Sequence, residues 1–355
     1  MSSLVDPGDP LPTAAADLVV TVEDLPVSGH KRNPLDRMQL LLHAHPAIGP
    51  FCVLVISSLV FDALNGRFLG SENISLMLQQ VAVIAALGVA QTLIILTAGI
   101  DLSIGAAMIL AQLFMAQVAA DNHWAALPAL ALGLFVGLVT GGVNGALVTR
   151  LRIPPFIATL GTLSIFTAIG LLYAQGQTTQ ASQMPGLLNW TGEIVKVGPF
   201  NLMYGVLVVF GIYIVVNYVL NETRWGQHIY AVGDDLEAAR LAGIRTNWVL
   251  FGVYAFAGVI VAVAAWISIG YAGAASPNNA VDANLESITA VVIGGTSLFG
   301  GRGGVIGTLF GALIVVAFTA GLTLANVNDL YQPIAEGILV IAAVAVDQWI
   351  RRVKA

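Results

Sequence analysis

The chain has 355 residues, of which 57% are hydrophobic and 10% are charged, and its mean hydropathy is +0.85. Soluble domains carry about 25% charged residues, so a surface this poor in charge cannot face water everywhere, and a wholly soluble protein is excluded. Five acids within the first 24 residues account for most of the net charge of −6, and the nearly balanced remainder gives no reason to expect nucleic-acid binding.

Residues 1–35 are rich in Pro, Asp, Ala and Val without a lasting period, so we expect a flexible tail there. From about residue 40 to 352, long apolar runs alternate with short polar links, which is typical of an all-α polytopic membrane protein. A helix crosses the hydrocarbon in ~20 residues. The sequence therefore predicts about ten transmembrane helices, at 46–64, 74–98, 104–120, 125–148, 155–174, 202–220, 248–270, 285–299, 304–325 and 331–349.

Two places in this series are unusual. The run at 285–299 is short for a full crossing, and only a few residues separate the second run from the third. A broken or re-entrant element is permitted where its backbone is buried in protein, so each place is a candidate for such an element.

The fourteen basic residues predict how the spans are oriented. With the amino terminus inside, twelve lie on cytoplasmic segments, and only Arg67 and Lys196 lie outside. Because Lys and Arg are concentrated in cytoplasmic loops, we expect both termini in the cytoplasm, together with the loop 221–247.

Glycines recur every four residues in two of the expected spans, at 133, 137, 141 and 145 and again at 303, 307 and 311. Small residues at this spacing let helix backbones approach closely in lipid, so we interpret these glycines as packing positions. The segments 142–148 and 309–315 are weakly similar to each other, which is a faint sign of an internal repeat.

The cytoplasmic loop carries its own helix signals. Asp234 or Asp235 is expected as the N-cap, and Asp234 with Glu237 has the spacing of a capping box. Helix formers follow at 236–242, and Gly243 suits the left-handed position that ends a helix. Two neighbouring spans can be connected by a loop much shorter than one that contains a capped helix. The capped helix predicts a docking element for a soluble motor protein, the alternative being a loop helix stabilised only within this chain.

The chain lacks the residues of a nucleotide-hydrolysing enzyme. Its three lysines do not follow glycine, so there is no phosphate-binding loop of the form Gly-x-x-x-x-Gly-Lys-Ser/Thr. Its five histidines include no plausible set of metal ligands. We therefore expect no catalytic residue, no metal and no cofactor in this chain, and no ATP hydrolysis by the chain alone.

Polar residues within apolar segments are the candidates for a transport pathway. A proton- or sodium-coupled carrier usually has paired charges inside its spans, and here no basic partner sits in mid-span. Asp101, between two spans, either caps the following helix or takes part in the pathway. Side chains of this kind more often join helices by hydrogen bonds. The residues we single out as candidates for the pathway or gate are Asp101, Ser103, Asn144, Thr159, Thr162, Gly294, Gly295, Thr296 and Ser297.

Three stretches, 97–105, 144–162 and 285–303, resemble signatures of the permeases of bacterial ABC importers for monosaccharides, of the ribose, xylose, galactose and fructose type. The last stretch, Leu-Glu-Ser-Ile-Thr-Ala-Val-Val-Ile-Gly-Gly-Thr-Ser-Leu-Phe-Gly-Gly-Arg-Gly, is the most specific. The resemblance covers about residues 40–352, which it identifies as a permease domain.

This resemblance implies the partners of the chain. Members of the family are inner-membrane proteins in which a second permease copy or paralogue joins the first. Two ATPase subunits, which hold ATP and magnesium, lie on the cytoplasmic side, and a soluble sugar-binding protein delivers substrate outside. The polar loop stands where the family has its ATPase-coupling helix, which assigns that role to Gly233, Asp234, Asp235, Glu237, Ala238, Ala239, Arg240, Leu241, Gly243 and Ile244. Gly-Asp-Asp at 233–235 replaces the Gly-Gly-Asn or Gly-Asp-Asn of many members, which should alter the cap and leave the docking role intact.

Two alternatives stay open at this level. The first is an ABC permease for a small solute other than a sugar, and the second is an ion-coupled secondary carrier, for which the sequence has few charges. The identity of the sugar, and whether the permease pairs with itself or with a paralogue, are left open too.

Overall fold

The computed structural model describes residues 47–278 and 283–328, together with positions 331, 333–335, 337–338, 341–342 and 345. The tail expected at 1–35 and most of the span expected at 331–349 lie outside these residues.

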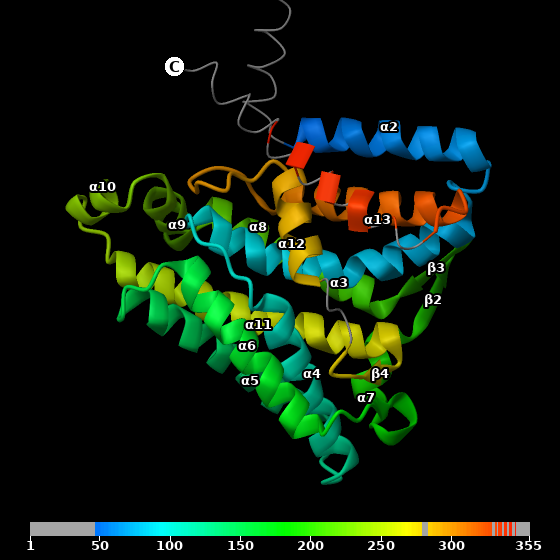
Figure 1. Cartoon of the computed structure of the whole chain (residues 1–355), viewed down its shortest axis with the longest axis horizontal. Coiled ribbons are helices and arrows are strands. Elements are labelled where there is room, and N and C mark those ends of the chain that lie inside the picture. The colour runs from blue at the N-terminus through cyan, green and yellow to red at the C-terminus, as the bar shows by residue number, and fades with distance from the viewer. Residues whose placement is uncertain are drawn as a thin grey trace, which may run out of the picture. The chain divides into compact units, whose positions relative to one another are not determined.

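The described part of the chain is an all-α, multi-pass membrane fold (Figure 1). Two shorter apolar helices, α4 (Ile104–Ala120) and α12 (Ala283–Ile293), lie among the long ones. Seven described helices are long and apolar enough to cross a membrane: α2 (Ile48–Asn65), α3 (Ser71–Leu96), α5 (Ala126–Thr149), α6 (Pro155–Ala174), α8 (Tyr204–Glu222), α11 (Thr246–Ala272) and α13 (Val305–Leu324).

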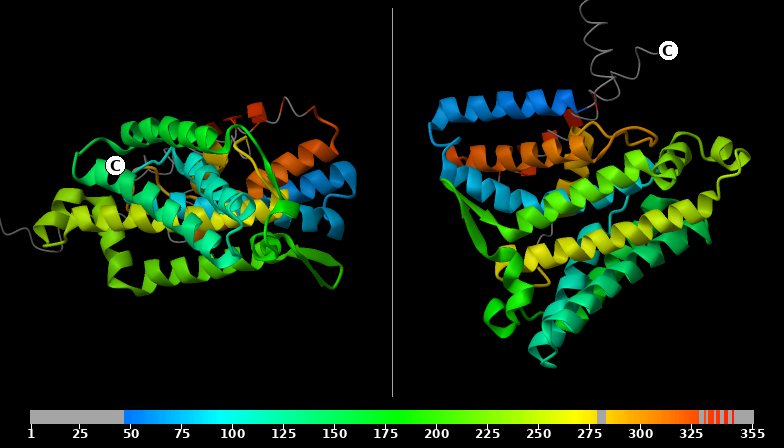
Figure 2. Two further views of the ribbon diagram at one scale, coloured as in Figure 1. Left: turned by 90° about the horizontal axis from the view of Figure 1, so that it is seen from below. Right: turned by 180° about the vertical axis from the view of Figure 1, so that it is seen from behind.

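Helix α3 lies at the centre of the described bundle. It contacts α11, α13, α12 and α8, and Figures 1 and 2 show it between α13 and α11. Every side chain from Val81 to Leu96 is buried. A helix that is apolar on all sides is expected in such an interior position, whereas α2, which faces outward over most of its length, lies at the edge.

Glycines bring the helices together as the fourfold spacing predicts. On α5, a Cβ atom at Gly137 would overlap the backbone of Gly258 on α11, and one at Gly141 would overlap the carbonyl of Tyr254. Gly133, in contrast, faces Met115 of α4. Close backbone approach is what small residues permit in a membrane, so the packing interpretation of this series is confirmed.

The expected span at 285–299 is wrong at its carboxyl end. Helix α12 stops at Ile293, because Gly294 and Gly295 follow and Gly295 has a left-handed φ of +82°. Eleven residues of helix rise ~16 Å, about half of the ~30 Å hydrocarbon core, so α12 is a partial crossing. The backbone of Ala290 in α12 lies against Gly311 of α13, and Gly294, directly after α12, lies against Gly307, so this backbone is buried in protein.

The loops gather at the two ends of the helices. At one end lie the short helices α9 (Arg224–Asp234) and α10 (Leu236–Leu241). At the other lies the hairpin of β2 (Ile194–Val197) and β3 (Phe200–Met203), with Lys196 opposite Asn201. The loops at this second end also contain β1 (Thr179–Gln180) paired antiparallel with β4 (Ala274–Ala275), the 3-10 turns η3 (Ala181–Gln183) and η4 (Trp190–Gly192), and α7 (Gly186–Asn189).

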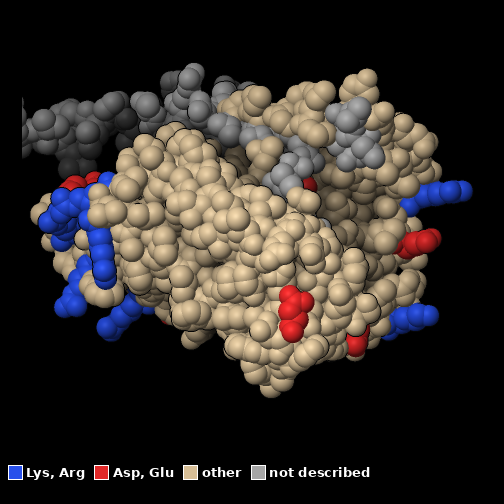
Figure 3. Space-filling model, turned by 60° about the horizontal axis from the view of Figure 1, so that its bottom comes forward, with Lys and Arg blue, Asp and Glu red and all other residues tan. Residues whose placement is uncertain are grey.

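The basic side chains follow this division. Figure 3 shows Lys and Arg gathered at opposite ends of the helices, with the larger group at the end that carries α10. This is the asymmetry from which the sequence predicts that α9 and α10 lie in the cytoplasm and the hairpin outside.

Candidate functional site

Helix α10 begins with a side-chain cap. The Oδ1 atom of Asp235 accepts hydrogen bonds from the amides of Glu237 and Ala238, both at 2.9 Å. These amides are among the first in the helix and have no partner within it, so the carboxylate satisfies them and its negative charge suits this end of the helix. Asp234 is instead the last residue of α9, so the alternative capping box of Asp234 with Glu237 is wrong.

The end of α10 is the one that the sequence predicts. Gly243 has a φ of +86°, its amide donates to the carbonyl of Arg240 at 3.0 Å, and the amide of Ile244 donates to the carbonyl of Ala239 at 3.1 Å. Left-handed glycine after a helix lets the chain turn back onto the last carbonyls.

Helix α10 turns most of its surface away from the bundle. Among its residues only Ala239 is buried, while Leu236 is 45% and Leu241 is 88% exposed. Glu237, Ala238 and Arg240 are exposed as well. A short helix with two exposed leucines between charged residues offers apolar contact and polar bonds to a partner at once.

The start of this segment is fixed to the membrane helices by backbone contacts. The amide of Gly301 donates to the carbonyl of Leu96, the last residue of α3, at 3.0 Å. Gly233, buried within α9, lies against both groups, and a Cβ atom there would overlap the Leu96 oxygen. Gly300 and Gly301 have positive φ values of +82° and +70°, conformations that favour glycine. Gly233 is therefore a packing residue, and α10 carries the exposed surface.

A second contact holds α9 to the same turn. The Tyr230 hydroxyl donates to the carbonyl of Gly303 at 2.9 Å. Burial raises the pKa of the Tyr230 hydroxyl above its ordinary value, so the group stays protonated and keeps donating. Sequence reasoning missed Leu96, Gly301 and Tyr230, and the glycine-rich run at 300–304 was the only signal for this junction.

Five of the nine pathway candidates form one buried network. The Oδ1 atom of Asp101 accepts from the amide and the hydroxyl of Ser103, at 2.7 and 2.6 Å. The Asn144 side-chain amide donates to Asp101 Oδ2 at 3.1 Å and to Ser103 Oγ at 2.8 Å. Thr162 donates to Asn144 Oδ1 at 2.7 Å, and Thr159 accepts from the amide of Leu102 at 3.1 Å.

This network joins the link between α3 and α4 to α5 and α6. Asp101 is only 5% exposed, and its carboxylate binds the amide of Ser103, the residue before α4, instead of an amide inside that helix. The expected helix cap at Asp101 is therefore wrong. A buried carboxylate needs such donors, and here they come from two other segments of the chain.

The other four candidates form the turn after α12. The amide of Ser297 donates to the carbonyl of Arg302 at 2.9 Å, and the hydroxyl of Thr296 accepts from the amide of Gly304 at 3.3 Å. Gly294 lies against Gly307 of α13, and Gly295 begins the turn. These residues shape the glycine turn that reaches Leu96. Their part in a pathway stays a prediction.

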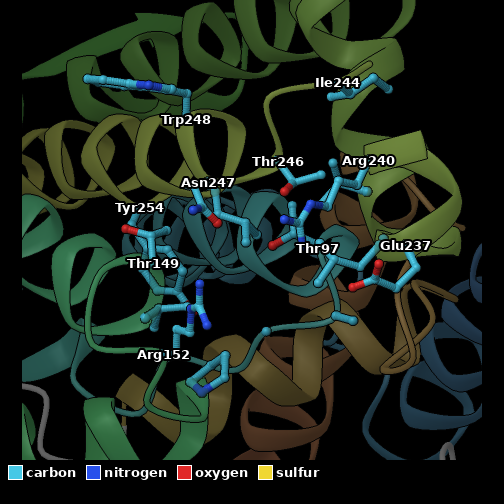
Figure 4. Close-up of a pocket in the computed structure, with 18 of the residues that line it drawn as sticks. Thr97, Thr149, Arg152, Glu237, Arg240, Ile244, Thr246, Asn247, Trp248 and Tyr254 are labelled. Atoms are coloured by element: carbon cyan, nitrogen blue, oxygen red, sulfur yellow. The ribbon is translucent and has the colours of Figure 1, made fainter. Parts of the chain in front are cut away.

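A cleft of about 1050 Å³ opens beside α10, at the end of the bundle that carries most of the basic side chains. Figure 4 shows Arg152 on one side of it and Arg240 and Glu237 on the other, with Thr149 and Tyr254 near Arg152. The link after α3, the link between α5 and α6, and the start of α11 complete its walls. Because α9 and α10 form one wall, a movement of these helices changes the width of the cleft.

Comparisons with known proteins bear on what this arrangement does. The model of the family described as "Branched-chain amino acid transport system / permease component" matches residues 73–344. The fructose import permease of Rhizobium meliloti is 44% identical over 330 residues, which cover 92% of each chain. The ribose import permease of Bacillus subtilis is 35% identical over 85% of this chain and 92% of its own. The D-allose transport system permease of Escherichia coli is 30% identical over 86% of this chain and 92% of its own.

No solved structure matches the chain.

Proposed function

The chain belongs to the family of branched-chain amino acid transport system permease components, and from that premise we propose that it is the membrane subunit of an ATP-driven importer for a monosaccharide. Its curated relatives are named import permeases for fructose and ribose and a transport permease for allose, and they match over nearly their whole length. The observation that carries the proposal is the capped, exposed helix α10, which is joined by backbone contacts to the end of the central helix α3.

The energy for transport comes from partners of the chain in this proposal. The complex contains two ATPase subunits, which bind ATP and magnesium, and one of them docks on α10 of each permease from the cytoplasm. When they close, they displace α10 with α9, and the contact of Gly233 with Leu96 and Gly301 passes this movement to α3 and to the turn before α13. A ligand shifts an equilibrium only by binding one state better than the other, so ATP must favour one arrangement of the helices.

The remaining partners complete a bacterial inner-membrane importer. A second permease copy or paralogue lies beside this chain, and a soluble sugar-binding protein delivers the substrate to the outer loops. The cytoplasmic cleft beside α10 is a candidate exit for the sugar. The Asp101 network keeps the α3–α4 link in place, and whether it touches sugar is decided by transport measurements on its variants.

Fructose is the first substrate to test, since the fructose permease shares 44% identity with this chain. The family description names amino acids, so a branched-chain amino acid is the comparison solute. In proteoliposomes that contain the chain, its ATPase and its binding protein, we expect uptake of a labelled monosaccharide that requires both partners and ATP. Uptake driven by an ion gradient without ATP, or uptake of the amino acid alone, contradicts the proposal.

A further inference from the structure

The outer hairpin is bound to the central helix through the backbone of one residue. The amide of Asn201 donates to the Ser75 hydroxyl at 3.0 Å, and the Gln79 side-chain amide donates to the Asn201 carbonyl at 3.2 Å. Ser75 donates its own proton to the carbonyl of Ser71 at 2.6 Å, so its oxygen is oriented to accept. Two side chains of α3 thus satisfy both backbone groups of Asn201, at the edge of the two-stranded sheet.

The same hairpin is joined to the coupling segment by the chain itself. Strand β3 ends at Met203 and α8 begins at Tyr204, while α8 ends at Glu222 and α9 begins at Arg224. Helix α8 therefore runs from the hairpin to α9 with a single residue between the two helices. Figures 1 and 2 show α8 and α3 running together between the two ends of the bundle.

Three contacts at different depths join α3 and α8 with their extensions. The outer one is Asn201 with Ser75 and Gln79. In the middle, the Tyr213 hydroxyl of α8 donates to the carbonyl of Ala85 at 3.2 Å, and both residues are buried. The inner one is the contact of Gly233 with Leu96. Close-packed elements with contacts at both ends and in the middle have low compressibility, so they move together.

We propose that α3 and α8 act as one rigid bar that carries a displacement of the outer hairpin to α10, and that Ser75 and Gln79 are positioning residues for this transmission. The inference rests on the proposed function, because the signal it describes is the stimulation of the ATPase by the sugar-loaded binding protein. The test measures the coupling between the two ends of the bar directly.

The test uses the reconstituted complex of permease, ATPase and binding protein. In the double variant Ser75→Ala with Gln79→Ala, complex assembly and the basal ATPase rate stay as in the parent. Stimulation of the ATPase by sugar-loaded binding protein falls at least about fivefold, the lower range of allosteric coupling effects. Gln80→Ala is the matched control, since Gln80 is the next residue on α3 and makes no hydrogen bond to the hairpin within the described part of the chain. This control keeps full stimulation.

A second measurement separates transmission from folding. Tyr213→Phe removes the middle hydrogen bond with little change in volume. Because residues in one network have non-additive effects, we expect Tyr213→Phe to lower the ATPase stimulation less in the double variant than in the parent. If the double variant does not assemble, Gln79→Ala alone is used: reduced ATPase stimulation supports the inference, and unchanged stimulation overturns it. Stimulation equal to that of the parent overturns the inference. Absence of ATP-dependent uptake by the parent complex contradicts the proposed function instead.

Discussion

The backbone amide of Gly301 donates a 3.0 Å hydrogen bond to the carbonyl of Leu96, and this bond joins the end of the central helix to the turn between α12 and α13. Gly233 of α9 lies against both residues. Three segments far apart in the sequence therefore meet backbone to backbone at one point. Helix α9 ends at Asp234, and a single residue separates it from the start of α10 at Leu236.

The first prediction concerns the space at this junction. In Gly233→Ala the added methyl group overlaps the Leu96 oxygen, and forced insertion into a packed site costs ~1–3 kcal/mol. We expect a lower midpoint of thermal unfolding for the permease in detergent and a lower ratio of sugar transported to ATP hydrolysed. The control is Gly211→Ala on α8, where no atom lies within 4 Å of the added Cβ. The same unfolding midpoint and the same transport ratio in both variants would contradict the tight packing of Gly233 at this junction.

The second prediction separates the two aspartates before α10. Asp235→Ala removes the acceptor for two amides and should destabilise the helix by ~1 kcal/mol. We expect faster hydrogen–deuterium exchange at residues 237–241 in the Asp235→Ala variant. Because Asp234 belongs to α9, Asp234→Ala should leave the exchange of these residues nearly unchanged. Asp235→Asn keeps an acceptor oxygen and should restore most of the protection. Faster exchange in the Asp234 variant alone would contradict the assignment of the cap.

The third prediction tests the network around Asp101. Asn144→Ala leaves the Asp101 carboxylate and the Thr162 hydroxyl each without one buried partner, a loss of ~1–3 kcal/mol. Thermal unfolding of the purified permease measures the effect, and Asn247→Ala, at an exposed position by the cleft beside α10, is the control. An Asn144 variant as stable as the parent that still loses sugar uptake would assign Asn144 a direct part in the pathway.

Much of the fold follows from the sequence pattern. The first seven predicted spans and the ninth agree with the observed helices within three residues at each end, because apolar runs of this length have few alternatives in a membrane. The predicted run at 285–299 reaches beyond the end of α12, because Leu298 and Phe299 continue its apolar character past the break at Gly294 and Gly295.

The junctions of the site are what the sequence could not supply. From the sequence, Asp101 is either a helix cap or a pathway residue because it precedes an apolar run, and only the fold shows Asn144 opposite its carboxylate. The contact between Leu96 and Gly301 joins two segments far apart in the sequence, and no short-range residue spacing predicts such a contact. The cap at Asp235 and the glycine stop at Gly243, in contrast, are local motifs, and the sequence contains all of their signal.

The central claim is that α10 is a cytoplasmic docking element for an ATPase, and Leu241 is the position at which to measure it. Its side chain is 88% exposed, so Leu241→Cys should leave the fold unchanged, whereas Ala239 is buried and a bulky residue there would strain α10 itself. In a Cys52→Ser background that removes the single natural cysteine, cells expressing this variant with its ATPase are treated with a membrane-permeant thiol–amine crosslinker. The account predicts a crosslink from position 241 to the ATPase subunit that changes in yield with ATP. Labelling of position 241 by an impermeant reagent from outside intact cells, with no crosslink to the ATPase, would contradict it.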